Sequence, residues 1–349
     1  MVEKNTHVGR WIENELSFWS NQHPNTRALN DFSTQINLSD PGIVLLEIIN
    51  DRVTLVDKPG LFKDNIIINR QNPISVRAMH YQKLLLDVIY SENLPNHHLR
   101  LIFNLKDYVE DFGQWPVFSF QKPIGSNNIL VPDIDFLVCR FYEKDLPPGA
   151  RDLRDYKSKD THATFVGSTT GRPIIDAHAV RALSIPRLRA ANFFRESAIV
   201  DFRLPRIVQC ESATVEAMIR DANLAGGPRI SWEDQLKSKF IISMDGNGAT
   251  CSRVAVALRS NSALIKYDSP HQLFYFSSLE PWRHFIPVSR DEDVPAIVEQ
   301  ECRDPGHFAS IAEQSKVFAM EQLSRKNIYA YMAALIRGYA ELVTVHWAD

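Results

Sequence analysis

The feature that most constrains this fold is a regular alternation of strand-like and helix-like segments between residues 161 and 289. Short apolar runs predict strands at 161–168, 198–204, 239–245, 262–268 and 284–289. The segments between them predict helices at 176–184, 231–238, 252–260 and 272–279. Alternating strands and helices favour a parallel sheet that is covered on both faces. The second half of the chain is therefore predicted to be an α/β domain.

The first half of the chain has a less regular pattern. Helices are expected at 8–20 and 75–92, a pair of strands within 42–57, and further strands at 99–105, 116–122 and 127–133. Two more helices, at 312–324 and 327–345, close the chain. Because 349 residues are too many for one ordinary core, we expect two domains. The best candidate for a linker is the charged, proline-containing segment 143–160.

Composition narrows the class of protein. The net charge of −3 provides no global basic field, so nucleic acid is not expected as a partner. The four cysteines form no CxxC pair, which favours reduced thiols over a zinc site or a disulfide framework. The N-terminal segment has no apolar signal region, and no apolar run reaches the roughly 18 residues that a membrane span needs. These features predict a cytoplasmic protein and leave a peripheral membrane contact open.

Residues suited to ligand binding follow several predicted strands. In open α/β sheets, ligands bind beyond the carboxyl ends of the strands. Three such ends are Gly167-Ser168-Thr169-Thr170-Gly171, Asp245-Gly246-Asn247-Gly248, and Lys266 with Asp268-Ser269-Pro270. In the first half of the chain, Asp107 ends a strand in the same way.

The glycine-rich segment after Asp245 has two interpretations. Its glycines allow a close backbone approach, and the helix that follows would direct free N–H groups at an anion. Arg253 in the first turn of that helix would add a positive charge, which suits a diphosphate. The segment lacks the third glycine of a dinucleotide fingerprint, and the chain has no GxxxxGK[ST] motif. An ordinary turn therefore stays open as the alternative.

Other motifs have plainer interpretations. Asp133-Ile134-Asp135 could bind a metal–nucleotide, but a loop with two solvated acids is favoured, because no further hard ligand is evident nearby. The aromatic residues 274–276 and Trp282 are expected in the core rather than in a sugar platform. The segment GSTTG is not a nucleophile elbow, which argues against a serine hydrolase.

Three segments in this order and spacing carry a family resemblance: KFIISMDGNGATCSR (239–253), NSALIKYDSP (261–270) and LEPWRHFIPV (279–288). Together they resemble glycosyltransferase family 90, which includes capsule xylosyltransferases, protein O-glucosyltransferases and lipopolysaccharide-modifying enzymes. TFVGSTTG (164–171) and, more loosely, residues 101–107 and 117–120 extend the resemblance upstream. It covers roughly residues 100 to 290, and the first 95 residues carry little of it.

The resemblance implies a GT-B architecture, with two Rossmann-like domains that face a cleft and a C-terminal helix that crosses back. Residues 1–155 would form the acceptor-side domain, completed by a helix at about 326–349, and residues 156–325 the UDP-sugar domain. The implied reaction is an inverting transfer from a UDP-sugar, with no cofactor and no metal. The implied partners are a UDP-sugar donor and a glycan or glycolipid acceptor.

The resemblance also assigns roles to residues. Asn104-Leu105-Lys106-Asp107 matches the family's N-x-[RK]-D motif, which makes Asp107 the implied catalytic base. Ser168, Arg172 and Arg253 would face the leaving diphosphate. The implied UDP-sugar site comprises Gly167, Ser168, Thr169, Arg172, Asp245, Gly246, Asn247, Gly248, Arg253, Lys266 and Ser269. Asp245 would either orient the glycine-rich loop or touch the sugar.

The chain departs from the family pattern in three segments. Val166 replaces a common arginine, Leu273 replaces a common glutamate, and Leu137-Val138 stands where most relatives have a tryptophan. The expected function is transfer of a hexose or pentose to a surface glycan of the lipopolysaccharide or capsule type. The departures keep a non-catalytic nucleotide- or glycan-binding protein open. A protein O-glycosyltransferase would use the same chemistry on another acceptor.

Overall fold

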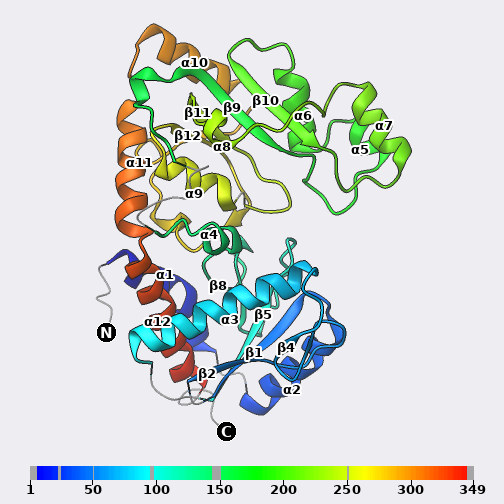
Figure 1. The fold of residues 1–349 in the computed structure, drawn as a ribbon, viewed down its shortest axis with the longest axis vertical. Helices are drawn as coiled ribbons and strands as arrows, with labels where there is room; N and C mark the ends of the chain where they lie inside the picture. Colours follow the sequence, from blue (N-terminus) through cyan, green and yellow to red (C-terminus); the bar gives the residue numbers. More distant parts are fainter. Residues whose placement is uncertain are drawn as a thin grey trace. The chain divides into compact units, whose positions relative to one another are not determined.

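The computed structural model describes residues 6–22, 25–49, 51–94, 98–143, 151–249 and 251–343. The chain groups into two compact units, which Figure 1 draws with the sequence colours. Unit 1 comprises Met1–Val138, His271–Ser278 and Ser324–Asp349, and unit 2 comprises Cys139–Pro270 and Leu279–Leu323. Part of the predicted linker, residues 144–150, lies outside the described residues.

The main sheet of unit 1 is mixed, with the strand order β2-β1-β5-β6-β8. Its strands are β1 (Ile43–Ile49), β2 (Arg52–Leu55), β5 (Leu99–Asn104), β6 (Val117–Ser119) and β8 (Ile129–Leu130). β1 runs antiparallel to both β2 and β5, whereas β5, β6 and β8 run parallel. Only the β5-β6-β8 half therefore has the parallel arrangement of a Rossmann-like sheet.

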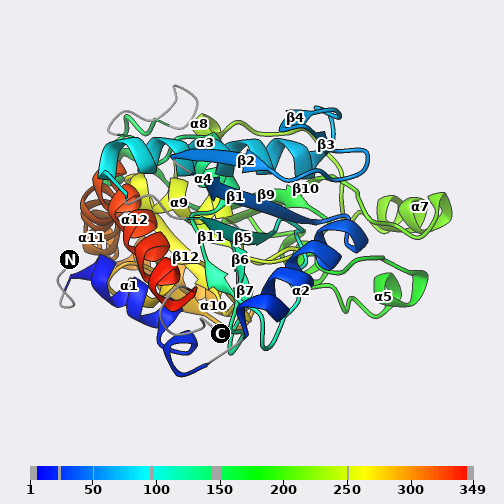
Figure 2. The same cartoon turned by 90° about the horizontal axis from the view of Figure 1, so that it is seen from below.

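Helices from both ends of the chain pack in unit 1. They are α1 (His7–Leu16), α2 (Thr26–Ser39), α3 (Pro73–Glu92), α4 (Ile134–Val138) and α12 (Arg325–Glu341), with a short 3₁₀ turn η1 at Trp19–Asn21. The α12 helix packs against α1 and α3, as Figure 2 shows from below. Tyr81 of α3 lies 4.9 Å from Phe103 of β5 and Tyr339 of α12 lies 5.1 Å from Phe118 of β6, measured between ring centroids. The last helix is thus part of the core of unit 1.

A short hairpin, β3 (Phe62–Lys63) and β4 (Ile66–Ile67), lies beside the outer strand β2. The Nε2 amide of Gln82, on α3, donates to the Val53 carbonyl oxygen at 2.8 Å. The Leu55 N–H donates to Oδ1 of Asn65, in the hairpin, also at 2.8 Å. Side chains thus satisfy two backbone groups of β2.

The sheet of unit 2 has the order β10-β9-β11-β12-β14, and all its strands are parallel. The strands are β9 (Asp160–Ser168), β10 (Val200–Arg206), β11 (Ser238–Ser243), β12 (Ala263–Tyr267) and β14 (Ile286–Val288). Each corresponds to a run predicted from the sequence, so the predicted parallel α/β sheet is confirmed. Phe165, Phe240 and Ile265 are fully buried in its core.

The helices of unit 2 are α5 (Ala177–Arg181), α6 (Pro186–Phe194), α7 (Ala213–Asp221), α8 (Trp232–Gln235), α9 (Cys251–Arg259), α10 (Asp293–Arg303) and α11 (Ala309–Gln322), with η3 at Tyr156–Ser158. Among them, α6, α9, α10 and α11 pack on the sheet. The segments that form α6, α7 and α10 were not predicted as helices from their sequence pattern.

The helix predicted at 272–279 is wrong. The chain forms β13 (His271–Gln272), which pairs antiparallel with β7 (Lys122–Pro123) of unit 1, and then the 3₁₀ turn η4 (Phe276–Ser278). Leu273, Phe274 and Tyr275 are all buried in succession, so the segment has no single apolar face.

None of the helices in the described ranges is long and apolar enough to cross a membrane.

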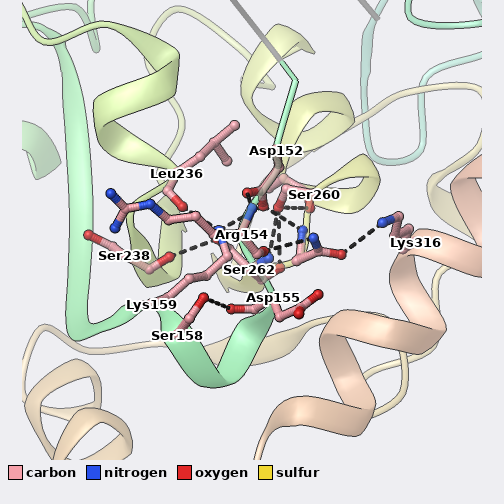
Figure 3. A network of polar contacts seen from close by, with 12 residues as sticks. Asp152, Arg154, Asp155, Ser158, Lys159, Leu236, Ser238, Ser260, Ser262 and Lys316 are labelled. Atoms are coloured by element: carbon pink, nitrogen blue, oxygen red, sulfur yellow. Dashed lines mark hydrogen bonds and ion pairs between the residues drawn. The ribbon is translucent and has the colours of Figure 1, made fainter. Parts of the chain in front are cut away.

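A buried ion pair joins the start of β9 to the rest of unit 2. The Lys159 ammonium donates to Oδ2 of Asp152 at 2.7 Å and also to the Leu236 carbonyl oxygen, and the two paired side chains are 0% and 4% exposed. The Asn261 N–H donates to the same Asp152 oxygen at 2.7 Å. Figure 3 shows this network, with Lys316 reaching toward it from α11. It lies at the amino-terminal edge of the sheet.

We expect Lys159→Met to destabilise the protein by about 3 kcal/mol, because removing one partner leaves the Asp152 carboxylate buried without its counter-charge. Chemical denaturation would measure the free energy of unfolding. The matched control is Lys157→Met. Lys157 lies two residues before Lys159 and its side chain is exposed, so this substitution should change the free energy of unfolding by less than about 0.5 kcal/mol. Equal losses in the two variants would contradict the role of the buried pair.

Candidate active site

The carboxyl edge of the unit 2 sheet brings together residues that are distant in sequence. β9, β11 and β12 are adjacent and parallel, so the chain leaves all three strands at the same edge. Ser168 ends β9, and Asp245 follows β11. Lys266 is the last residue but one of β12 and pairs with Ser243 of β11. The predicted convergence of these strand ends follows from this topology.

Arg187, near the start of α6, ties two of these strand ends together. Its Nη1 donates to the Ser168 carbonyl oxygen at 3.1 Å and to Oγ1 of Thr170 at 2.8 Å. Its Nη2 donates to the Met244 carbonyl oxygen at 2.9 Å, and its Nε donates to the Asp245 carbonyl oxygen at 3.0 Å. Arg187 as a whole is 6% exposed, and its Cζ lies 5.2 Å from the centre of the Phe165 ring.

Two of the predicted glycines make room for this arginine. A Cβ atom on Gly246 would lie 2.3 Å from Oγ1 of Thr170 and 2.9 Å from Cζ of Arg187. A Cβ atom on Gly167 would lie 2.8 Å from the Phe165 ring and 3.3 Å from Nη1 of Arg187. The space beside Gly246 is thus filled by the protein's own side chains.

Arg253 is a second buried guanidinium beside the same aromatic ring. It lies in the first turn of α9, and its Cζ is 4.4 Å from the centre of the Phe165 ring and 5.3 Å from that of Trp232. Its Nη2 donates to the Val166 carbonyl oxygen, and its Nη1 makes a longer bond of 3.3 Å to Oε1 of Gln235. Its Nε is buried and has no hydrogen-bond partner within the described residues.

The two arginines concentrate positive charge in a desolvated place. Burial lowers the pKa of Arg187 to about 10, and the negative charge of Asp245 opposes part of this shift. Burial, with a smaller contribution from the charge of Arg187, lowers the pKa of Arg253 to about 9. Both guanidiniums remain charged at neutral pH, so they repel each other and favour a bound anion.

The third strand end is joined through Asp245. Its Oδ2 accepts a hydrogen bond of 2.6 Å from Oγ of Ser269, which lies beyond β12. Burial lowers the pKa of the nearby Lys266, and the charges of Asp245 and Asp268 oppose this shift. The amide of Gly246 donates to the Gly248 carbonyl oxygen at 3.2 Å, which closes the glycine-rich loop around the half-buried Asn247. Asp245 therefore links two loops of the site.

Two predicted donor-site residues lie differently. The hydroxyl of Thr169 is bonded to the Val208 backbone, donating to its carbonyl oxygen and accepting from its N–H. The Arg172 side chain is 43% exposed, and its ion-pair partner is Asp176 at 3.9 Å. No contact in the described part of unit 2 joins either side chain to the two buried arginines.

Asp107, the predicted base, follows β5 in unit 1. The Nη2 of Arg77, on α3, donates to Oδ1 of Asp107 at 2.6 Å, and Nη1 of Arg77 donates to the Leu105 carbonyl oxygen at 2.5 Å. The amide of Gln121 donates to the Asp107 carbonyl oxygen at 2.5 Å. The Asp107 side chain is 51% exposed. The carboxylate is thus held on one oxygen and accessible to solvent.

The prediction that Asp133 is a solvated loop residue is wrong. Asp133 is fully buried, and its Oδ1 accepts a hydrogen bond of 2.7 Å from the N–H of Phe136 at the start of α4. Burial, with a smaller contribution from Asp135, raises the pKa of Asp133 to about 8. Of the described residues, no three His, Cys, Asp or Glu side chains are grouped as metal ligands would be.

The aromatic residues are divided between core and surface. Phe274 and Tyr275 are buried in unit 1, as expected, but Trp282 in unit 2 is 60% exposed. Trp282 also has a left-handed backbone, with φ at 64°, which is unusual for a bulky residue. The expectation of a core position is therefore wrong for Trp282.

The family of this chain follows from a comparison with protein-family profiles. The profile described as "Glycosyl transferase family 90" matches residues 100–348, which is more than half of the chain. The chain belongs to glycosyl transferase family 90. The matched region includes Asp107 and both buried arginines, whereas the whole α3 helix precedes it.

Several curated members of this family are similar to the chain. Protein O-glucosyltransferase 3 of Homo sapiens is 25% identical over 35% of this chain and 24% of its own length. Protein O-glucosyltransferase 2 of Danio rerio is 26% identical over 68% and 47%, respectively. O-glucosyltransferase rumi of Drosophila pseudoobscura pseudoobscura is 23% identical over 70% and 61%. The chain therefore spans from about a quarter to three fifths of the length of these relatives.

Arg187 is the site residue that sequence reasoning missed. It lies in a helix that was not predicted, because the segment IPRLRAANFF has only a weak apolar periodicity. The available signal was Pro186, which suits the first turn of a helix. An arginine one residue later would then stand at a helix start close to the Ser168 strand end.

We expect the buried Asp133 to make stability depend on pH. The pKa of Asp133 is raised from 3.8 to about 8 in the folded state, so folding favours the protonated carboxyl. The stability that depends on this protonated form is fully present below about pH 4 and is lost as the pH rises toward 8. Asp133→Asn should remove this loss, so the variant should gain about 4 kcal/mol of stability relative to the unsubstituted protein between pH 5 and pH 9. Unfolding curves across this range would measure it, and a constant difference between the proteins would contradict the assignment.

Proposed function

We propose that this chain is a glycosyltransferase that moves a sugar from a UDP-sugar to a hydroxyl group, with inversion at the anomeric carbon. Membership of glycosyl transferase family 90 supports the activity class. The observation that carries the donor assignment is the pair of buried, charged arginines at the carboxyl edge of a parallel sheet, one with an unpartnered Nε. A diphosphate is the anion that fits such a site.

On the donor side, the positive charges would stabilise the leaving group. As the glycosidic bond to UDP breaks, negative charge develops on the diphosphate. Arg253 would face that charge directly, with Lys266 and the hydroxyl of Ser168 as further donors. In this proposal the side chains supply the positive charge without a metal ion. Val166 acts through its carbonyl oxygen, which accepts from Arg253, so the lack of an arginine at this position leaves that contact intact.

On the acceptor side, Asp107 would act as the general base. Its carboxylate takes the proton of the acceptor hydroxyl while the oxygen attacks the anomeric carbon from the face opposite the UDP. Arg77 holds Oδ1, which directs the role of proton acceptor to Oδ2. A single displacement of this kind inverts the anomeric configuration.

For the acceptor, we propose a hydroxyl of a protein side chain, with glucose as the first sugar to test. The relatives described above are named protein O-glucosyltransferase or O-glucosyltransferase. None of those three names supports the surface-glycan acceptor that was expected from the sequence. Assays with protein and with glycan acceptors would distinguish the two.

The first prediction concerns the donor. UDP should raise the thermal unfolding midpoint, because a ligand that binds only the folded state stabilises it, by about 2.7 kcal/mol at one hundred times its Kd. UMP should stabilise less and uridine least, since each loses phosphate charge that the arginines would contact. Equal shifts with all three ligands would contradict a diphosphate site, and no shift with any would exclude UDP-sugar donors.

The second prediction concerns the base. Asp107→Asn should lower kcat by about 10²–10⁴-fold while UDP binding persists, because the amide cannot take the proton. Product formation from UDP-glucose would be measured beside UDP affinity. Glu110→Gln is the matched control, since Glu110 is an exposed carboxylate in the same loop and should retain activity. Near-normal turnover by Asp107→Asn would overturn the mechanism. UDP binding without turnover in the unsubstituted protein would favour a binding protein.

A further inference from the structure

The two buried arginines use their donors differently. A guanidinium has five N–H donors. Arg187 gives four of them to the chain itself, to the carbonyl oxygens of residues 168, 244 and 245 and to the Thr170 hydroxyl. Arg253 gives two, and its Nε is unpartnered among the described residues. Most N–H donors of Arg187 therefore bond to the protein itself, whereas Arg253 has N–H donors that bond to no described residue.

The acceptors of Arg187 lie on two separate loops. Residues 168 and 170 follow β9, and residues 244 and 245 follow β11. The planar fork of Arg187 spans both loops with bonds of 2.8–3.1 Å. Through the 2.6 Å bond between Asp245 and Ser269, the loop after β12 is joined to the same assembly. One side chain thus connects all the loops that carry the candidate donor site.

The surroundings of Arg187 are fitted to it closely. Gly167 and Gly246 border the guanidinium, and a Cβ on either would come within 3.3 Å of it. Phe165 lies beneath, and the side chain is almost completely buried. Burying a charged group is costly unless its hydrogen bonds are satisfied, and here the chain's own carbonyl oxygens satisfy them. The loops and the arginine therefore define each other's positions.

We propose that Arg187 is a positioning residue, which holds the loops after β9 and β11 in the geometry that binds the diphosphate of a nucleotide. This inference rests on the proposed function. Its content is separate, because it assigns the fixed geometry of the site to Arg187 and ligand contact to Arg253. Lysine cannot replace Arg187 in this role, since an ammonium is a point donor and does not span four acceptors in one plane.

The test compares variants that keep the charge with a control from the same helix. Arg187→Lys keeps the charge and loses the fork, and Thr170→Val keeps the arginine and removes one acceptor. Arg189→Lys is the matched control. The Arg189 side chain is half exposed, and its Nε donates to Oδ2 of Asp291 at 2.8 Å, away from the loops after β9 and β11. UDP affinity would be measured by calorimetry at a temperature where circular dichroism shows every variant folded.

We expect Arg187→Lys to weaken UDP binding at least tenfold, Thr170→Val to weaken it about fivefold, the effect of one lost hydrogen bond, and Arg189→Lys to leave it unchanged. A merely structural role would lower the unfolding midpoint and leave the Kd of the folded variants unaltered. That result, or wild-type affinity in Arg187→Lys, would overturn the proposal.

Two further outcomes are separable. If Arg187→Lys does not fold, Thr170→Val decides, and unchanged affinity in it would overturn the proposal. If the unsubstituted protein does not bind UDP, the proposed function itself fails, and the positioning role toward a nucleotide fails with it. Gly246→Ala gives an independent check, because its methyl group would displace the guanidinium and should weaken UDP binding to a similar degree.

Discussion

The candidate donor site depends on how two positive charges are kept out of water. Desolvating a guanidinium is unfavourable, and desolvating two beside one phenylalanine ring adds mutual repulsion. Backbone carbonyl oxygens at the ends of β9 and β11 offset part of this cost for Arg187. For Arg253 the compensation is incomplete. Because this positive charge is only partly compensated without a ligand, binding of an anion beside Arg253 would be favourable.

The parallel sheet of unit 2 is what makes such an arrangement possible. Parallel strands end at a common edge, and their last carbonyl oxygens would be left without partners there. An arginine that enters from a neighbouring helix satisfies several of them at once. The same contacts that complete the backbone hydrogen bonding of the fold therefore also place positive charge where a ligand would bind. In the proposed site, the contacts that stabilise the fold would therefore also set the geometry for binding.

Much of unit 2 could be predicted because its signals are local. Strand-like runs ending in Ser168, Asp245 and Lys266 indicated which edge would carry the ligand, and the parallel topology follows from their alternation with helices. Arg187 could not be found this way, because its partners are backbone atoms about 20 and 60 residues away in sequence, as their numbering shows. Asp133 was misjudged since hydrophilic residues are normally exposed, and nothing local reveals that Asp133 caps a buried helix. Asp107 was proposed from a family motif, and its ion pair with Arg77 depends on a helix that precedes most of that resemblance.

The hairpin beside β2 has a consequence for the behaviour of the chain among its own copies. An outer strand with unpaired backbone groups is a template on which another molecule can add a strand, which leads to aggregation. Here the carbonyl of Val53 and the N–H of Leu55 are occupied by the amides of Gln82 and Asn65. These two backbone groups of the outer strand are thereby unavailable to a strand of another molecule. The two side-chain amides thus act together with Arg52, an exposed charged residue of the edge strand itself, in hindering the addition of another strand.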